Sequence, residues 1–249
     1  MANFHLEFEP ISRKQGRSPI RAASYQSGEK LRDDYYGKTY YHNRNDVLYT
    51  EIMLPIDAPP ELSNRQILWH EVDKIENRSD SRTAHRVIGS LPNEKEFMLD
   101  DYIKIIREYV SDNFVEIGMC TDVAIHMVKN INPTRNNPHV HILLTDRPVN
   151  QNGFCSKKNR DWNKRENIKL WREEWANVQN RAYERKGLNV RITAKSYIDR
   201  GIFDREPKQY LIRKDMYLER INIRTIKGDK NRAIEKRNRE HEISRDRDR

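Results

Sequence analysis

The order of hydrophobic and polar residues predicts several strands in this chain. Phe4, Leu6 and Phe8 alternate with polar residues, and this period of two is typical of a strand with one buried face. Residues 46–54 and 83–91 also have the composition of strands, and a proline follows each of them. Two further runs, VAIHMVK and HVHILLT, flank a loop rich in Asn and Pro, which predicts a β-hairpin.

Apolar residues at helical spacing predict helices between and after these strands. The first helix follows Ser18 and Pro19, which supply an N-cap and a proline in the first turn. Helices are predicted over residues 19–31, from Ser63 onward, over 95–115 and over 163–185. From Lys227 the chain is polar with alternating charge, and we expect either an exposed helix or disorder there.

The hairpin sequence predicts a cluster of histidines. Side chains at positions i and i+2 of a strand share a face, so His139 and His141 should project together. If the loop is centred near residues 132–134, His126 lies opposite one of these two histidines on the other arm. A lone His-apolar-His pair is common on solvated strand faces, but a third His at the symmetric position favours a shared function.

Three imidazoles on one patch predict a divalent metal site. Three protein ligands leave coordination positions open, as a catalytic metal requires. Imidazole alone does not select the metal. It suits zinc, copper, iron or nickel, and also manganese or magnesium when phosphate oxygens complete the shell.

Charge is distributed unevenly along the 249 residues. The chain has 47 Lys and Arg against 38 Asp and Glu, a net charge of +9. Residues 1–156 hold 19 basic and 22 acidic residues, a net charge of −3, so all of the basic excess lies after position 156. This excess favours a polyanionic partner.

Composition also bears on location. No apolar run reaches the 18 residues expected of a membrane span, and the N-terminus lacks the layout of a secretory signal. We therefore expect a cytoplasmic protein without membrane insertion. Cys120 and Cys155 are too few for a disulfide framework and are expected to be reduced thiols.

Tyr25 lies among small residues in the first predicted helix, which leaves its hydroxyl free to meet a ligand. A phenol is a poor nucleophile at neutral pH unless a base or a cation favours the phenolate, and a metal-bound phosphate is such a setting. A second tyrosine cluster is interpreted either as stacking platforms for bases or as a loop packed on the sheet. Its members are Tyr35, Tyr36, Tyr40 and Tyr41.

Three segments of the chain together resemble the MobA/MobL family of plasmid mobilisation relaxases, within the HUH endonucleases. They are RSPIRAASYQSGEKL, AIHMVKNINPTRNNPHVHILLTDR and LWREEWANVQNRAYERKGLNVRI. The resemblance implies an α+β fold with a central antiparallel β-sheet flanked by α-helices. It also implies a relaxase domain over residues 1–225 and a charged extension over 226–249.

The resemblance further implies an activity. The chain is expected to nick and rejoin single-stranded DNA at an origin of transfer in the bacterial cytoplasm, with accessory relaxosome and coupling proteins as partners. Tyr25 looks like the nucleophile that stays joined to the DNA 5′ end. His126, His139 and His141 look like ligands of the Mg²⁺ or Mn²⁺ ion that polarises the scissile phosphate.

The chain departs from the family before the Leu-Pro that follows residues 83–90. Many members carry acidic residues there, whereas Arg86 and Ile88 occupy the aligned positions here. The group that orients a ligand histidine or takes the phenol proton is therefore open. Glu51 and Asp146 are the substitutes that the sequence offers.

Basic residues at the head of the segment 157–191 are the candidates for contacts with the DNA backbone, although a solvated helix face has the same composition. They are Lys157, Lys158, Arg160, Lys164 and Arg165.

Two other functions fit parts of the sequence. A nucleic-acid binder that has lost catalysis predicts salt-sensitive DNA binding without nicking. A histidine-metal hydrolase of another substrate predicts chelator-sensitive activity that does not need Tyr25.

Overall fold

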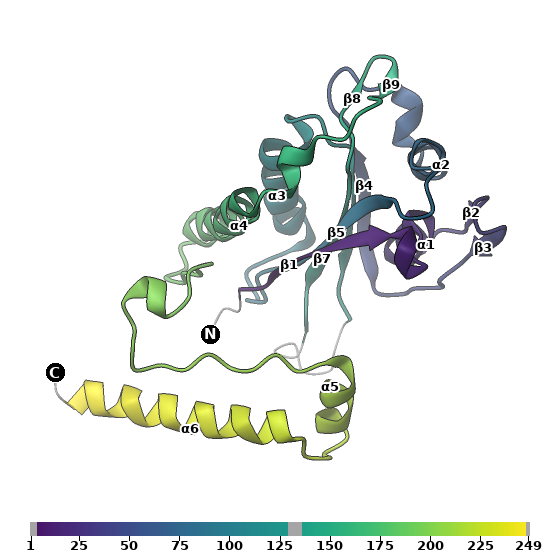
Figure 1. Ribbon diagram of the computed structural model, residues 1–249. Coiled ribbons are helices and arrows are strands. Elements are labelled where there is room, and N and C mark those ends of the chain that lie inside the picture. The colour runs from purple at the N-terminus through teal and green to yellow at the C-terminus, as the bar shows by residue number, and fades with distance from the viewer. Residues whose placement is uncertain (1–3, 129–135, 248–249) are drawn as a thin grey trace. The chain divides into compact units, whose positions relative to one another are not determined.

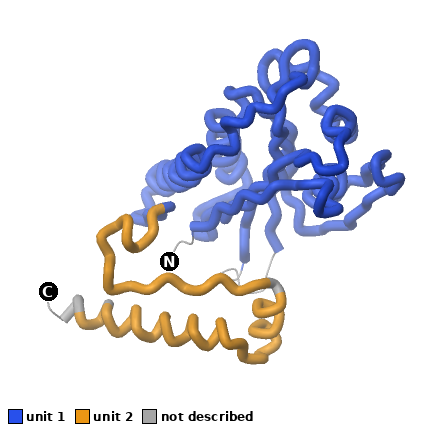
Figure 2. Tube along the Cα trace, in the orientation of Figure 1, with its two compact units in different colours: residues 1–194 blue, residues 195–249 orange. Residues whose placement is uncertain are grey.

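The computed structural model describes residues 4–128 and 136–247. The chain divides into two compact units, residues 1–194 and 195–249 (Figure 2). The domain boundary predicted at 225/226 lies inside the second unit, at the start of helix α6 (Ile226–Arg247). Most of the loop of the predicted hairpin, residues 129–135, lies outside the described residues.

The first unit contains a five-stranded sheet in the order β1-β5-β7-β6-β4, and every neighbouring pair is antiparallel (Figure 1). This confirms the fold expected from the resemblance. All five sequence segments predicted as strands are present, within a few residues at each end. The strands are β1 (Leu6–Ser12), β4 (Val47–Met53), β5 (Arg82–Ser90), β6 (Thr121–His126) and β7 (His139–Thr145).

Helices cover both faces of this sheet (Figure 1). Alternate residues of the central strand β7 point to opposite faces, as the pleat requires. Val140 and Ile142 pack in one buried cluster with Trp175 of α4, whereas Leu143 packs in the other with Trp69 of α2. The helices of this unit are α1 (Pro19–Ser27), α2 (Arg65–Ile75), α3 (Leu99–Val110) and α4 (Arg165–Arg185).

Small elements complete the two units. The first unit has two short hairpins, β2 (Leu31–Asp33) with β3 (Lys38–Tyr40) and β8 (Val149–Asn150) with β9 (Gly153–Phe154). The second unit contains α5 (Arg213–Arg220) and α6, so the described part of the charged tail is helical. Among residues 4–128 and 136–247, no helix is both long and apolar enough to cross a bilayer.

Helix α1 begins where the sequence predicts and ends earlier. The Ser18 side chain accepts a hydrogen bond from the Arg21 amide, and Pro19 occupies the first turn. The helix stops at Ser27 because Gly28 takes the left-handed conformation, with φ of 76°. The predicted end at residue 31 was therefore wrong, and β2 starts at that residue.

A buried carboxylate on β6 holds helix α2 against the sheet. Asp122 is fully buried and accepts hydrogen bonds from Arg65 Nε at 2.9 Å, Arg65 Nη2 at 3.0 Å and Trp69 Nε1 at 2.8 Å. The side-chain Nε2 of Gln26 donates to the Asp122 carbonyl at 2.8 Å, which joins α1 to the same strand.

We expect Asp122→Ala to lower the free energy of unfolding by about 3–5 kcal/mol, because it leaves the Arg65 guanidinium buried without this partner. Urea denaturation followed by circular dichroism measures the change. Asp80→Ala is the control, since Asp80 pairs with Arg78 in solvent and should contribute little. Equal midpoints for the two variants would rule out this role for Asp122.

Candidate active site

The three predicted histidines meet at the centre of the sheet. The sequence left two registers open for the hairpin, and the structure has the one in which His126 lies opposite His139. His141 lies opposite Ala124 on the same face. This face is the one that α1 and α2 cover, so the helix that carries Tyr25 lies over the histidines.

The imidazoles are close enough to share one ion. The ring centroids of His126 and His141 are 4.4 Å apart, those of His139 and His141 are 5.1 Å apart, and those of His126 and His139 are 5.4 Å apart. One ligand nitrogen from each ring lies within 4.8 Å of the other two. His126 and His141 are buried and His139 is partly exposed, so the group is open on one side.

Backbone carbonyls orient two of these rings. A carbonyl oxygen only accepts, so His126 Nε2–H donates to the Gln26 carbonyl at 2.6 Å, and His139 Nδ1–H donates to the Asn137 carbonyl at 2.7 Å. The other nitrogen of each ring is then a free acceptor. Within the described residues, Nδ1 of His126 and Nδ1 of His141 are buried without a hydrogen-bond partner.

The electrostatics of the histidines suit metal binding. Burial lowers the pKa of His126 to about 4 and, with the neighbouring His126 and His139, lowers the pKa of His141 to about 2. Both rings are therefore neutral near pH 7, with lone pairs available. Orphaned buried nitrogens are rare in proteins, and a bound cation would satisfy them. The three residues thus fit a divalent metal ion.

Tyr25 lies beside this triad. Its side chain is 41% exposed, and its ring meets the His141 ring edge-on, with 6.1 Å between centroids. The Arg44 guanidinium carbon lies 4.3 Å from the centre of the Tyr25 ring, and the His42 ring packs edge-on at 5.5 Å. A phenol, a cation and three imidazoles therefore share one partly open site.

Arg44 is a site residue that sequence reasoning missed. Its Nε and Nη2 donate to the two carboxylate oxygens of Asp46 at 2.8 and 2.5 Å. These hydrogen bonds lower the pKa of Asp46 to about 2. The Asp46 carbonyl accepts from the Met127 amide at 2.8 Å, next to His126. The Arg-x-Asp sequence was the available signal, but nothing in it indicated the partner.

Gln26 was also missed. Its carbonyl orients His126 while its side chain bonds to β6, so a single residue fixes the distance between α1 and the histidines. Because Gln26 is adjacent to Tyr25 in the helix, the same contacts position the phenol.

The structure does not bring Glu51 to the histidines. Glu51 lies opposite Val123, on the α3 side of the sheet, and Arg107 donates to both of its oxygens at 2.9 Å. Asp146 is likewise engaged elsewhere, by His85 and Arg82. We therefore assign neither carboxylate to the site.

Arg86 and Ile88, which stand where the resemblance implies acidic residues, lie on the same face of the sheet as the histidines. Ile88 of β5 is directly opposite His141. Arg86 donates to Glu9 on the edge strand, which also pairs with Arg17. The hydrogen bond from Arg17, opposed in part by burial, lowers the pKa of Glu9. The position that faces His141 thus has an apolar side chain.

Four of the five predicted DNA-contacting residues are exposed. Lys158 is the exception, because its ammonium pairs with Glu76 at 2.9 Å and lies 3.5 Å from Asp146. The exposed residues are Lys157, Arg160, Lys164 and Arg165. Of the tyrosine cluster, Tyr41 is largely exposed, and Tyr35 packs under the Arg13 guanidinium at 3.7 Å.

Comparisons with known proteins show which family this chain resembles. The MobA/MobL family matches residues 17–216. A solved structure described as "Molecular Basis of Vancomycin Resistance Transfer in Staphylococcus aureus" superposes with a TM-score of 0.71 at 31% identity, covering 79% of this chain and all of that one.

Two curated relatives are similar in sequence. A "Probable mobilization protein MobA" of Bifidobacterium longum is 30% identical over 150 residues, which cover 60% of this chain and 26% of that protein. A "Probable conjugal transfer protein TraA" of Sinorhizobium fredii is 28% identical over 233 residues, covering 81% of this chain. This chain spans 20% of that relative's length. Because the family match covers most of this chain, the chain belongs to the MobA/MobL family.

Proposed function

We propose that this chain is a relaxase that nicks and rejoins one DNA strand at a plasmid origin of transfer and so starts conjugative transfer. The observation that carries the proposal is the Tyr25 phenol beside a buried triad of neutral histidines. The names of the relatives, a conjugal transfer protein and a mobilisation protein, support the same role.

The phenol oxygen of Tyr25 attacks the scissile phosphorus. A bond forms between this oxygen and phosphorus, and the bond from phosphorus to the 3′ oxygen breaks, with the 3′ oxygen taking the electron pair and a proton. The DNA 5′ end remains on Tyr25 as a phosphodiester. This linkage retains the energy of the cut bond, so a 3′ hydroxyl can reverse the step and reseal the strand.

His126, His139 and His141 would hold a divalent ion, which we propose to be Mg²⁺ or Mn²⁺. Bound there, the ion would polarise a phosphate oxygen and offset charge in the transition state. The histidines need no deprotonation to bind it, because burial already keeps His126 and His141 neutral.

Arg44 adds a second positive charge at the phenol. Asp46 holds the guanidinium from the side, and Gln26 holds the helix that carries Tyr25. The phenol and the cation are thus placed before DNA arrives, which lowers the cost of reaching the transition state.

We expect Arg44→Ala to slow nicking about 10- to 100-fold, because a fixed cation beside the reacting oxygen is lost. Arg44→Lys should recover part of the rate. Single-turnover cleavage of an origin oligonucleotide measures the effect. Arg32→Ala is the matched control, since Arg32 lies on the neighbouring hairpin and pairs with Asp34 in solvent. Wild-type cleavage by Arg44→Ala would remove Arg44 from the mechanism.

The proposed substrate is single-stranded DNA at the origin, with accessory relaxosome and coupling proteins as further partners. The exposed cations Lys157, Arg160, Lys164 and Arg165 are proposed to contact its phosphates, so binding should weaken steeply with salt. We place the relaxase domain over residues 1–225 and the charged extension over 226–249. The family match ends at residue 216, before the proposed extension begins.

The test of the proposed function is covalent capture. Wild-type protein incubated with origin DNA and Mg²⁺ or Mn²⁺ should form a DNA adduct that survives SDS, and Tyr25→Phe should form none.

A further inference from the structure

The segment that follows β3 places a histidine beside the phenol. His42 is partly buried, and its ring packs edge-on against the Tyr25 ring, with 5.5 Å between centroids. The backbone of the same segment lies against the glycine that ends α1, because a Cβ added to Gly28 would lie 3.6 Å from the His42 carbonyl oxygen. His42 is therefore held against the helix that carries Tyr25.

Ser24 of that helix determines which nitrogen of His42 carries the proton. The Ser24 hydroxyl donates its one hydrogen to the Glu29 carbonyl at 2.7 Å, and its oxygen lies 3.3 Å from His42 Nδ1. Because the hydroxyl hydrogen points at Glu29, the hydroxyl oxygen accepts from His42, and Nδ1 is the nitrogen that donates. Nε2 of the neutral ring therefore bears the lone pair.

The surroundings of His42 keep the ring neutral. Burial, followed by the charges of Arg21 and Arg44, lowers the pKa of His42 from its ordinary value. The imidazole is thus neutral near pH 7 and able to accept a proton. Once protonated beside two guanidinium groups, it would be a good acid and would return the proton readily.

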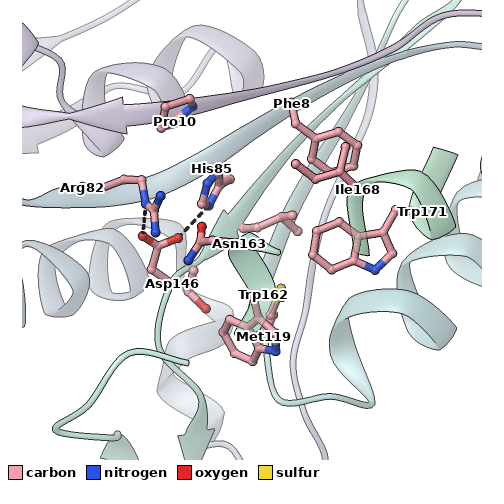
Figure 3. A pocket seen from close by; sticks show the side chains of 12 residues that line it. Phe8, Pro10, Arg82, His85, Met119, Asp146, Trp162, Asn163, Ile168 and Trp171 are labelled. Atoms are coloured by element: carbon pink, nitrogen blue, oxygen red, sulfur yellow. Dashed lines mark hydrogen bonds and ion pairs between the residues drawn. The ribbon is translucent and has the colours of Figure 1, made fainter. Parts of the chain in front are cut away.

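The other groups near the phenol are unsuited to this part. Arg44 has no lone pair to offer, and His141 is proposed to give its lone pair to the metal. Both carboxylate oxygens of Asp46 accept from Arg44. His85 is a second histidine whose ring is held by a partner, but it bonds to Asp146 at 2.7 Å on the opposite face of the sheet (Figure 3).

We propose that His42 is the general base that takes the phenol proton of Tyr25. The inference rests on the proposed function and supplies the proton acceptor that the sequence left open. A nucleophile, a base that contacts it and a third group that orients the base are the recurring parts of an activated nucleophile, and here they are Tyr25, His42 and Ser24.

The proton and the phosphoryl group move together in this step. As the phenol oxygen bonds to phosphorus, its O–H bond breaks and the proton passes to His42 Nε2, directly or through one water. The 3′ oxygen leaves with the electron pair of its bond to phosphorus and takes a proton from water. In the sealing step the imidazolium returns its proton to the phenol oxygen as that oxygen leaves phosphorus.

The test is rescue of His42→Ala by imidazole, measured as single-turnover formation of the Tyr25 adduct with origin DNA and Mn²⁺. We expect His42→Ala to slow adduct formation about 100-fold, the lower end of what general bases contribute. Imidazole in solution should restore part of the rate, because it can enter the space that the side chain leaves. Asn43→Ala, at the exposed neighbouring position, is the control and should react like wild type.

His42→Phe separates proton transfer from packing. It keeps a ring against Tyr25 but has no nitrogen, so it should be as slow as His42→Ala and should not respond to imidazole. Both variants should bind Mn²⁺ and single-stranded DNA as wild type does. Wild-type rates in either variant, or a slow His42→Ala that imidazole does not accelerate, would overturn the base alone. Absence of the adduct from the wild-type protein would overturn the proposed function as well.

Discussion

Replacing His141 by alanine should lower Mn²⁺ affinity about a hundredfold or more and abolish metal-supported cleavage. Loss of groups that only orient a ligand typically costs 10- to 100-fold, and His141 is expected to be a ligand itself. Its Nδ1 is buried without a partner among the described residues, and of the three rings it lies nearest to each of the other two. Isothermal titration calorimetry with Mn²⁺ measures the affinity directly.

The same loss is expected for His126→Ala and His139→Ala, with binding of single-stranded DNA mostly retained. His70→Ala is the control, because His70 lies on α2 and pairs only loosely with Asp34, at 3.6 Å. Wild-type Mn²⁺ affinity in the His126 and His141 variants would show that these imidazoles are not ligands. A chelator should abolish cleavage by the wild-type protein in the same way.

Tyr25→Phe should eliminate the covalent adduct and reduce nicking by at least a thousandfold, the loss expected when a nucleophile is removed. The ring remains, so its contacts with His141 and Arg44 persist and DNA affinity should stay near that of wild type. A gel assay of the adduct and of nicked product measures both effects. Tyr41→Phe is the control, because Tyr41 is exposed and should be dispensable for the chemistry.

The histidine site could be predicted because it depends on local rules. The period of two along β7 places His139 and His141 on one face, and hairpin symmetry brings His126 to them. Only the strand register was open, because the hairpin loop could be centred at either of two positions. The hydrogen bonds of the described residues then add what the sequence lacks, namely which nitrogen of each ring is free.

Glu51 illustrates why a neighbouring strand could not be placed. A bulge between Val47 and Tyr49 inserts one extra residue into β4, so that Val47 lies opposite His126 while Tyr49 lies opposite the adjacent Ile125. A single extra residue moves every later side chain to the opposite face. Without it, Glu51 would lie opposite Asp122 on the histidine side. With it, Glu51 lies opposite Val123 and pairs with Arg107 instead.

Arg44 and Gln26 escaped prediction for a different reason. Their roles come from contacts between residues far apart in the chain: the Arg44 guanidinium with the Tyr25 ring, and the Gln26 carbonyl with His126. No spacing rule within one element encodes such a contact. The position opposite His141, where the family resemblance implies an acidic residue, is occupied by Ile88. The charged group beside the Tyr25 ring is instead the Arg44 guanidinium, a cation.

We propose that Tyr25 is the residue that becomes joined to DNA. The direct measurement is mass spectrometry of tryptic peptides from the SDS-resistant adduct formed with origin DNA and Mn²⁺. We expect a nucleotide-linked peptide whose modification maps to Tyr25, and no adduct from Tyr25→Phe. Attachment at another residue, or undiminished adduct from Tyr25→Phe, would contradict it.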